Sequence, residues 1–224
     1  MIGMYTQLLK KRMNTQLEPT NQEFMGYITE GVSRMQHLLD DLLHYSRLGK
    51  DHADIKEVDL NNIIFVVIHN LMPVMNETKA EITTQNLPKI MASSTAMIQV
   101  FQNLVANAIK FRKKDSVPQI IIKFKENTEG YLFSIKDNGI GIKKEYAQRV
   151  FNIFERLNAR QDYEGSGIGL ATCKKIVENM SGRIWVRSIE GEGSTFYILF
   201  PKPKVGHRKP TKISNTKLLV DAFA

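Results

Sequence analysis

The chain has 224 residues, of which 42% are hydrophobic and 24% charged, and its formal net charge is +8 at pH 7. This composition is that of an ordinary globular protein of one or two domains, and no apolar run approaches the roughly 18 residues of a membrane helix. The start has no signal-peptide pattern and the single Cys173 excludes an internal disulfide, so we expect a cytoplasmic protein without membrane insertion.

Residues 1–49 favour a helical hairpin. Apolar residues at three- and four-residue spacing predict a helix over 1–13. After Pro19, the segment Thr20 to Glu23 has the form of a capping box. One apolar stripe then continues to about Leu48, formed by Phe24, Ile28, Val32, Met35, Leu39 and Leu42. Two helices cannot bury this stripe, so we expect residues 1–48 to form half of a dimeric four-helix bundle; the alternative is packing against the chain's own second domain.

Residues 50–57 are polar and aperiodic and are interpreted as a linker to a second domain over 58–201. Helices are expected over 63–71, 95–112 and 170–180, the last with Gly182 as its cap. Strands are expected over 119–126, 131–136, 183–188 and 194–200. Helices set against a mainly antiparallel sheet predict an α+β fold.

The first of four short motifs runs from Gln102 to Phe111. It places the amides of Asn103 and Asn107 on one face of a helix, with Lys110 one turn further on. An amide oxygen suits Mg²⁺, a hard ion that keeps several waters, and a lysine can meet a phosphate as a point charge. Asparagines on helices are commonly solvated, so this motif alone is weak.

The other three motifs are rich in glycine. Asp137 to Ile142 combines a carboxylate at a strand end with Gly139 and Gly141, which permit close approach of backbone to a ligand, although it could also be an ordinary turn. Gly165 to Leu170 opens a helix, where backbone N–H groups can bind phosphate. Gly191 to Phe196 is most simply a hairpin turn.

In this order the four motifs resemble the N, G1, G2 and G3 boxes of sensor histidine kinases, and Phe151 to Arg156 resembles their F box. The resemblance covers residues 1–201 and is strongest to the phytochrome-like group. It implies a helical hairpin followed by an α/β sandwich ATPase domain of the histidine kinase/Hsp90-like type, with ATP and Mg²⁺ as cofactors. It also implies a mobile lid over 158–164, with Phe151 and Phe154 packed beneath it.

The resemblance, together with the motif chemistry, gives a set of candidate site residues. Asn107 is the expected metal ligand, Asp137 the expected acceptor for the adenine amino group, and Asn107 and Lys110 the catalytic candidates. The candidate nucleotide contacts are Asn103, Asn107, Lys110, Phe111, Asp137, Gly139, Gly141, Ile142, Arg156, Gly165, Ser166, Gly167, Ile168, Gly169, Leu170 and Thr195.

The family's phosphoacceptor histidine precedes an acidic residue, with a proline a few residues on. Of the five histidines, none has both neighbours; the nearest imitation is His69 to Pro73, on the first helix expected in the second domain. Residues 1–9 resemble the segment that follows the acceptor, so we expect a phosphoryl donor whose acceptor lies outside this chain. A response regulator receiver domain would take the phosphate next, and a sensor domain would lie upstream. The rival interpretations are a non-catalytic ATP-binding dimerisation module, a chaperone or mismatch-repair ATPase of the same superfamily, and a basic nucleic-acid binder, which would show strongly salt-dependent binding through the C-terminal tail.

Residues 202–224 form a basic tail, with six lysines and arginines against Asp221. A solvated chain end explains such a segment most simply, and an anionic membrane or phosphate-rich partner is the alternative. Since much of the net charge lies in this tail, we expect no nucleic-acid partner.

Overall fold

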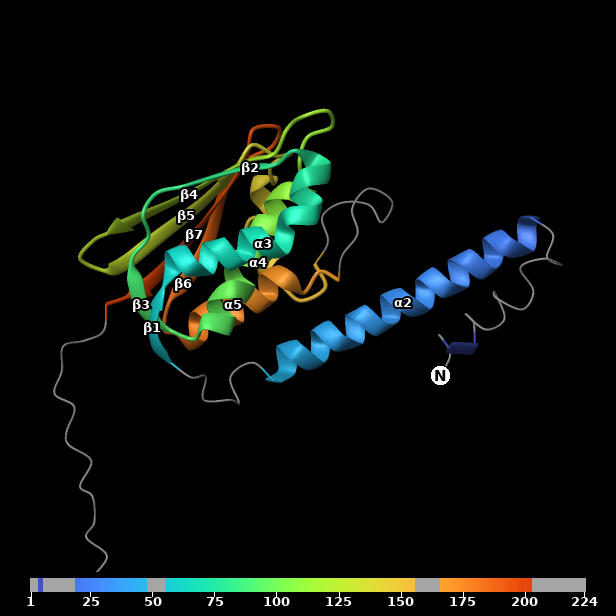
Figure 1. Ribbon diagram of the computed structural model, residues 1–224, viewed down its shortest axis with the longest axis horizontal. Helices are drawn as coiled ribbons and strands as arrows, with labels where there is room; N and C mark the ends of the chain where they lie inside the picture. Colours follow the sequence, from blue (N-terminus) through green and yellow to red (C-terminus); the bar gives the residue numbers. More distant parts are fainter. Residues whose placement is uncertain (1–3, 6–18, 48–54, 156–165, 203–224) are drawn as a thin grey trace, which may run out of the picture.

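The computed structural model describes residues 4–5, 19–47, 55–155 and 166–202, which form a long helix and a two-layer sandwich (Figure 1). Most of the helix expected over 1–13 and most of the 50–57 linker lie outside these residues, as does the tail after Lys202. The sandwich confirms the expected α+β fold.

The long helix α2 spans Pro19–Arg47. It begins one residue before the expected capping box, because proline suits the first helical position, where its missing N–H costs nothing. The Glu23 carboxylate accepts a hydrogen bond from the Tyr27 hydroxyl, at 2.6 Å. Val32 is buried, but the rest of the expected stripe is exposed, with 54% exposure at Phe24 and 59% at Leu39. The stripe therefore does not pack on the sandwich in this structure.

The sandwich follows from Lys56 onward. Its strands are β1 (Lys56–Asp59), β2 (Glu81–Thr84), β3 (Lys89–Ala92), β4 (Gln119–Glu126), β5 (Gly130–Asp137), β6 (Arg183–Ile189) and β7 (Gly193–Pro201). Its helices are α3 (Leu60–Thr78), α4 (Ser94–Lys110) and α5 (Gly169–Asn179), with the short 3-10 turns η1 (Lys144–Tyr146) and η2 (Arg149–Phe151).

The main sheet has five strands in the order β2-β4-β5-β7-β6. The β2–β4 pair is parallel and the other three pairs are antiparallel. Strands β1 and β3 form a separate antiparallel ribbon. Helices α3, α4 and α5 cover one face of the main sheet, and no helix in the described part of the chain covers the other (Figure 1). The short strands β1, β2 and β3 carry too few residues for alternation to reveal them in the sequence.

Two helix ends differ from expectation. Helix α3 begins at Leu60, three residues early, because Asp59 caps it by accepting the N–H of Asn61 at 2.9 Å. Helix α5 ends at Asn179 with Met180 as its C-cap, and the left-handed residue that follows is Ser181, at φ 57°, not Gly182. Glycine is required at 182 for a different reason: a Cβ there would lie 2.6 Å from the carbonyl oxygen of Leu199. The cap predicted at Gly182 is therefore displaced by one residue.

The core lies between the three helices and the sheet. Phe101 of α4 and Phe133 of β5 are fully buried, and their rings meet edge to face with centroids 6.1 Å apart. Phe124 and Phe200 extend this aromatic cluster across the neighbouring strands. The cluster fixes α4 on the sheet, and α4 carries the first motif.

We expect Phe133→Ala to lower the free energy of unfolding by about 3–5 kcal/mol, because it opens a cavity in the centre of this cluster. The matched control is Phe65→Ala on α3, where the ring is 73% exposed and the change should stay within about 0.5 kcal/mol. Urea denaturation measures both. Similar losses for the two variants would contradict the assignment of the core.

Candidate functional site

One cavity of about 590 Å³ opens between α4, α5 and the end of β5. Twelve of the candidate residues line it: Asn103, Asn107, Lys110, Phe111, Asp137, Gly141, Ile142, Ser166, Gly167, Ile168, Gly169 and Leu170. These twelve residues come from three motifs, and Ser194 and Phe196 of the fourth motif line the same cavity. The volume and the mixed polar and apolar lining are typical of a small-molecule site.

Helix α4 contributes the amides and the lysine of the first motif. The amide nitrogen of Asn103 donates to the carbonyl oxygen of Gly169 at 3.2 Å, which joins α4 to the start of α5. Asn107 lines the cavity one turn further on. The ammonium of Lys110 lies 4.5 Å from the centre of the Phe111 ring. This face of α4 thus presents an amide and a positive charge to the cavity.

Asp137 is a buried carboxylate at the end of β5, with 8% of its surface exposed. Its Oδ1 accepts the N–H of Gly139 at 2.9 Å and the N–H of Ser194 at 3.0 Å. Burial raises its pKa above the ordinary 3.8, although these two hydrogen bonds oppose the rise. Because both bonds converge on Oδ1, the second oxygen remains to accept a hydrogen bond from a ligand.

The second motif needs its glycines for close contacts between backbone segments. Gly141 has φ 70°, and a Cβ there would collide with the carbonyl oxygen of Ile189. A Cβ at Gly139 would collide with the carbonyl oxygen of Phe111. Gly139 does not line the cavity, and its close approach to Phe111 accounts for the glycine there.

The third motif ends in the first turn of α5. Gly167 has φ 73°, and its carbonyl oxygen accepts the N–H of Phe154 at 3.0 Å. The Ser166 hydroxyl accepts the N–H of Ile168 at 3.3 Å. The N–H groups at a helix start have no partner within the helix, and residues 168–170 line the cavity. An anionic group would be stabilised there by these N–H groups and by the helix dipole.

The structure does not place all of the candidate residues at the cavity. Thr195 does not line the cavity, because alternation along β7 directs its neighbours Ser194 and Phe196 towards it instead. Arg156, Gly165 and the expected lid over 158–164 lie outside the described residues. Of the two phenylalanines expected beneath the lid, Phe151 is buried against Phe196, but Phe154 is 55% exposed, with φ 64°.

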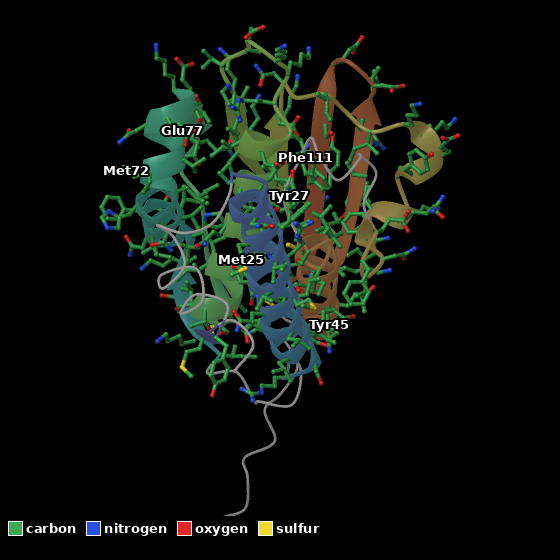
Figure 2. All side chains as sticks on the ribbon, turned by 90° about the vertical axis from the view of Figure 1, so that its right-hand side faces the viewer. Met25, Tyr27, Tyr45, Met72, Glu77 and Phe111 are labelled. Atoms are coloured by element: carbon green, nitrogen blue, oxygen red, sulfur yellow. The ribbon has the colours of Figure 1, made fainter. Side chains whose placement is uncertain are left out.

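Helix α2 also contributes side chains to the cavity, which the sequence did not predict. Asp41 and His44 line the cavity beside Gln99, and the Nε2 atom of His44 lies 3.0 Å from the Gln99 side-chain oxygen. The ammonium of Lys175 on α5 donates to the Tyr45 carbonyl oxygen at 2.7 Å. Figure 2 shows this end of α2, marked by Tyr45, in front of the sandwich. No local pattern reports such a contact, because α2 and α4 are about 55 residues apart along the chain.

Cys173 has no chemical role in the cavity. Burial raises the pKa of its thiol to about 12, although a hydrogen bond with Asn103 opposes the rise. The thiol donates to the Val100 carbonyl oxygen at 3.7 Å. A fully buried thiol is inert, so Cys173 packs α5 against α4.

The comparisons with known proteins agree with this geometry. A sequence model of the histidine kinase-, DNA gyrase B- and HSP90-like ATPase family matches residues 92–204. The chain is 43% identical over its whole length to cyanobacterial phytochrome A of Nostoc sp., of which it spans 29%. It is 40% identical over 89% of its length to the phytochrome-like protein Cph1 of Synechocystis sp., of which it spans 27%. It thus spans less than a third of either relative.

Solved structures show the same fold. Full-length ShkA in complex with AMPPNP superposes with a TM-score of 0.67 at 26% identity, covering 89% of this chain and 42% of that one. The catalytic domain of the histidine kinase ThkA superposes with a TM-score of 0.57 at 25% identity, covering 66% of this chain and 98% of that one.

The fold and the cavity define a nucleotide-binding α/β sandwich. The chain belongs to the histidine kinase-, DNA gyrase B- and HSP90-like ATPase family and, within it, to the sensor histidine kinase type. Among the described residues, no helix is both long enough and apolar enough to cross a membrane.

The variant Asp137→Asn should distinguish a role of Asp137 in folding from a role in nucleotide binding. The amide oxygen can still accept the N–H groups of Gly139 and Ser194, so the loop should persist. The raised carboxylate pKa means that the ionised group opposes folding at pH 7, so the variant should melt at the same or a higher temperature. This difference in melting temperature should shrink as the pH falls through the raised pKa to below 3.8, where the Asp137 carboxyl is neutral in the folded and in the unfolded protein.

The same variant should bind adenine nucleotides roughly 10- to 150-fold more weakly, which corresponds to about 1.5–3 kcal/mol for a lost charge-assisted hydrogen bond. Calorimetric titration with ADP and thermal melting on the same sample decide both points. Unchanged affinity in a folded variant would exclude Asp137 as the adenine contact.

Proposed function

We propose that this chain is the phosphoryl-donor region of an ATP-dependent protein histidine kinase in a two-component signalling system. The observation that carries the proposal is a single cavity with Asp137 buried at one side and the open start of α5 at another. A carboxylate that can accept from an amino group suits adenine, and helix N–H groups suit phosphate. The AMPPNP complex of the related ShkA supports a nucleotide as the ligand.

The residues present fit ATP with Mg²⁺. The described residues contain no cluster of three histidine, cysteine or acidic side chains for a metal. A magnesium ion would therefore be held by the Asn107 amide oxygen together with the phosphate oxygens and water, as its oxygen preference allows. The ion would neutralise charge on the transferring phosphoryl group, while Lys110 and the α5 N–H groups position the phosphates.

The exposed stripe of α2 supports a homodimer through residues 1–48. Phe24, Ile28, Met35 and Leu39 are each more than half exposed, and such a continuous apolar surface is uncommon on a monomer. In this proposal, two copies bury the stripe in a four-helix bundle. The phosphate would then pass to a receiver domain of a response regulator, in the cytoplasm.

A non-catalytic ATP-binding module remains the second candidate. It is favoured by the histidines, because His37, His44 and His69 are followed by leucine, tyrosine and asparagine, not by an acidic residue. The two candidates differ in phosphoryl transfer and not in nucleotide binding, so transfer is the measurement that separates them.

Asn107→Ala should weaken ATP binding about tenfold or more with Mg²⁺ and by less than about twofold with EDTA, because only the metal-bridged interaction is lost. The matched control is Asn76→Ala on the exposed side of α3, which should change neither value. Calorimetry with and without metal measures both. An equal loss of ATP affinity with Mg²⁺ and with EDTA would exclude Asn107 as the metal ligand. If the wild-type chain bound neither ATP nor ADP, the proposed function would be wrong.

The chain alone should form no acid-labile phosphohistidine, because transfer depends on positioning and no histidine has the acceptor's neighbours. When it is mixed with a separate helical hairpin that carries an acceptor histidine before an acidic residue, label from ATP should appear on that hairpin. Acid and base stability of the product identify the linkage. Label on His37, His44 or His69 would overturn the acceptor argument, and no transfer despite ATP binding would favour the non-catalytic module.

A further inference from the structure

The main sheet has a second face that none of the described helices covers (Figure 1). The strand register aligns its side chains in rows across the sheet, because residues on one face of paired strands are neighbours. One row runs Ile121, Lys136, Thr195 and Arg187; the next runs Lys123, Ser134, Tyr197 and Trp185; the third runs Lys125, Leu132, Leu199 and Arg183. We call these twelve residues the open face.

The open face is strongly basic. Lys123, Lys125, Lys136 and Arg187 are exposed, and none of them forms an ion pair within the described part of the chain. Arg183, at the rim, pairs with Glu129 at 2.6 Å.

Negative charge on this side of the sheet is sparse. Of the carboxylates in the five strands, Asp137 belongs to the nucleotide cavity and Glu126 pairs with Lys202 at 2.7 Å. Glu81, on the edge strand β2, is the remaining one and shares this side by alternation. The cations are therefore distributed over three strands, β4, β5 and β6, with little compensating charge.

The centre of the open face is aromatic. The rings of Trp185 and Tyr197 stack with centroids 5.3 Å apart and an angle of 12° between their planes. The guanidinium of Arg187 lies 5.7 Å from the Tyr197 ring centre. Tryptophan and tyrosine combine an apolar body with a polar edge, which suits the boundary between lipid and water. The two principal cavities of the described residues contain no open-face residue.

We propose that the open face binds the surface of an anionic lipid bilayer. Cations spread over a plane, unpaired and on long flexible stems, match a planar array of mobile anionic headgroups, which requires no fixed stereochemistry. The nucleotide cavity lies on the helix side of the sheet, so it stays accessible. This inference does not depend on the kinase proposal.

Other occupants fit less well. A second copy of the same face and the chain's own tail are both basic, so they would be repelled. Nucleic-acid binding through a sheet uses free aromatic ring faces for base stacking, whereas Tyr197 already contacts Trp185 and Arg187. Stable protein partners anchor side chains in pockets, and this face has none among the two principal cavities.

The experiment is sedimentation of the 224-residue chain with phosphatidylcholine vesicles, with and without roughly one-third phosphatidylserine. Wild type should bind only the anionic vesicles, and binding should fall when salt rises from about 0.1 to about 0.5 M, because screening shortens the electrostatic range. Each cation contributes about 1 kcal/mol, or about fivefold. The double variant Lys123→Gln with Lys136→Gln should therefore bind about 25-fold more weakly.

The matched control is Lys79→Gln with Lys114→Gln, which removes the same charge from two exposed lysines that lie outside the open face. It should bind within about twofold of wild type, since distant exposed charges are largely screened. Circular dichroism verifies the folding of each variant. Equal losses in the two double variants would mean attraction by net charge alone and would overturn the proposal.

Two further results would also overturn it. If removal of residues 203–224 abolishes binding while the Lys123 and Lys136 variant still binds, the tail is the membrane element and the open face is not. If a single-stranded RNA or an aspartate- and glutamate-rich peptide binds the chain more tightly than the vesicles at equal salt, and the open-face variant loses that binding, the face serves that partner instead.

Discussion

The Oδ1 atom of Asp137 accepts hydrogen bonds from the N–H groups of Gly139 and Ser194, and these residues belong to two motifs more than 50 positions apart. This one oxygen holds the loop after β5 against the start of β7, which leaves the other oxygen for a ligand. The glycines follow from the same constraint, because Cβ atoms at Gly139, Gly141 and Gly193 would collide with the backbone segments brought together here. Burying the carboxylate raises its pKa and so costs stability at neutral pH. A buried charged group that lowers stability is expected where its side chain serves binding more than folding.

Helices α4 and α5 form the other side of the cavity. The contacts between these two helices also position the residues that line the cavity. The Asn103 amide binds the Gly169 carbonyl oxygen, and the Cys173 thiol binds the Val100 carbonyl oxygen one turn away. The first turn of α5 is thereby aimed into the cavity while Asn107 and Lys110 stay on its wall. Residues that look like ligands in the sequence thus divide into those that face the cavity and those, such as Asn103, that also tie the helices together.

The regular parts of the sandwich could be predicted because local patterns are strong there. Strand β4 occupies Gln119–Glu126 as expected, and α4 differs by one or two residues at each end. Most of the cavity could also be predicted, because three motifs each carry several constrained residues. That Thr195 does not line the cavity could not be predicted, because motif membership does not state on which face of a strand a residue lies. The contribution of Asp41 and His44 could not be predicted, because it depends on how α2 rests on α4, which no local periodicity encodes.

The central claim is that Asp137 and the start of α5 bind the two ends of one nucleotide. The most direct measurement is a crystal structure of the 224-residue chain with a non-hydrolysable ATP analogue and Mg²⁺. The adenine amino group should lie within hydrogen-bond distance of the second Asp137 oxygen, and the phosphates should lie at the N–H groups of Gly169 and Leu170. An analogue bound elsewhere, or bound here with its adenine away from Asp137, would contradict it.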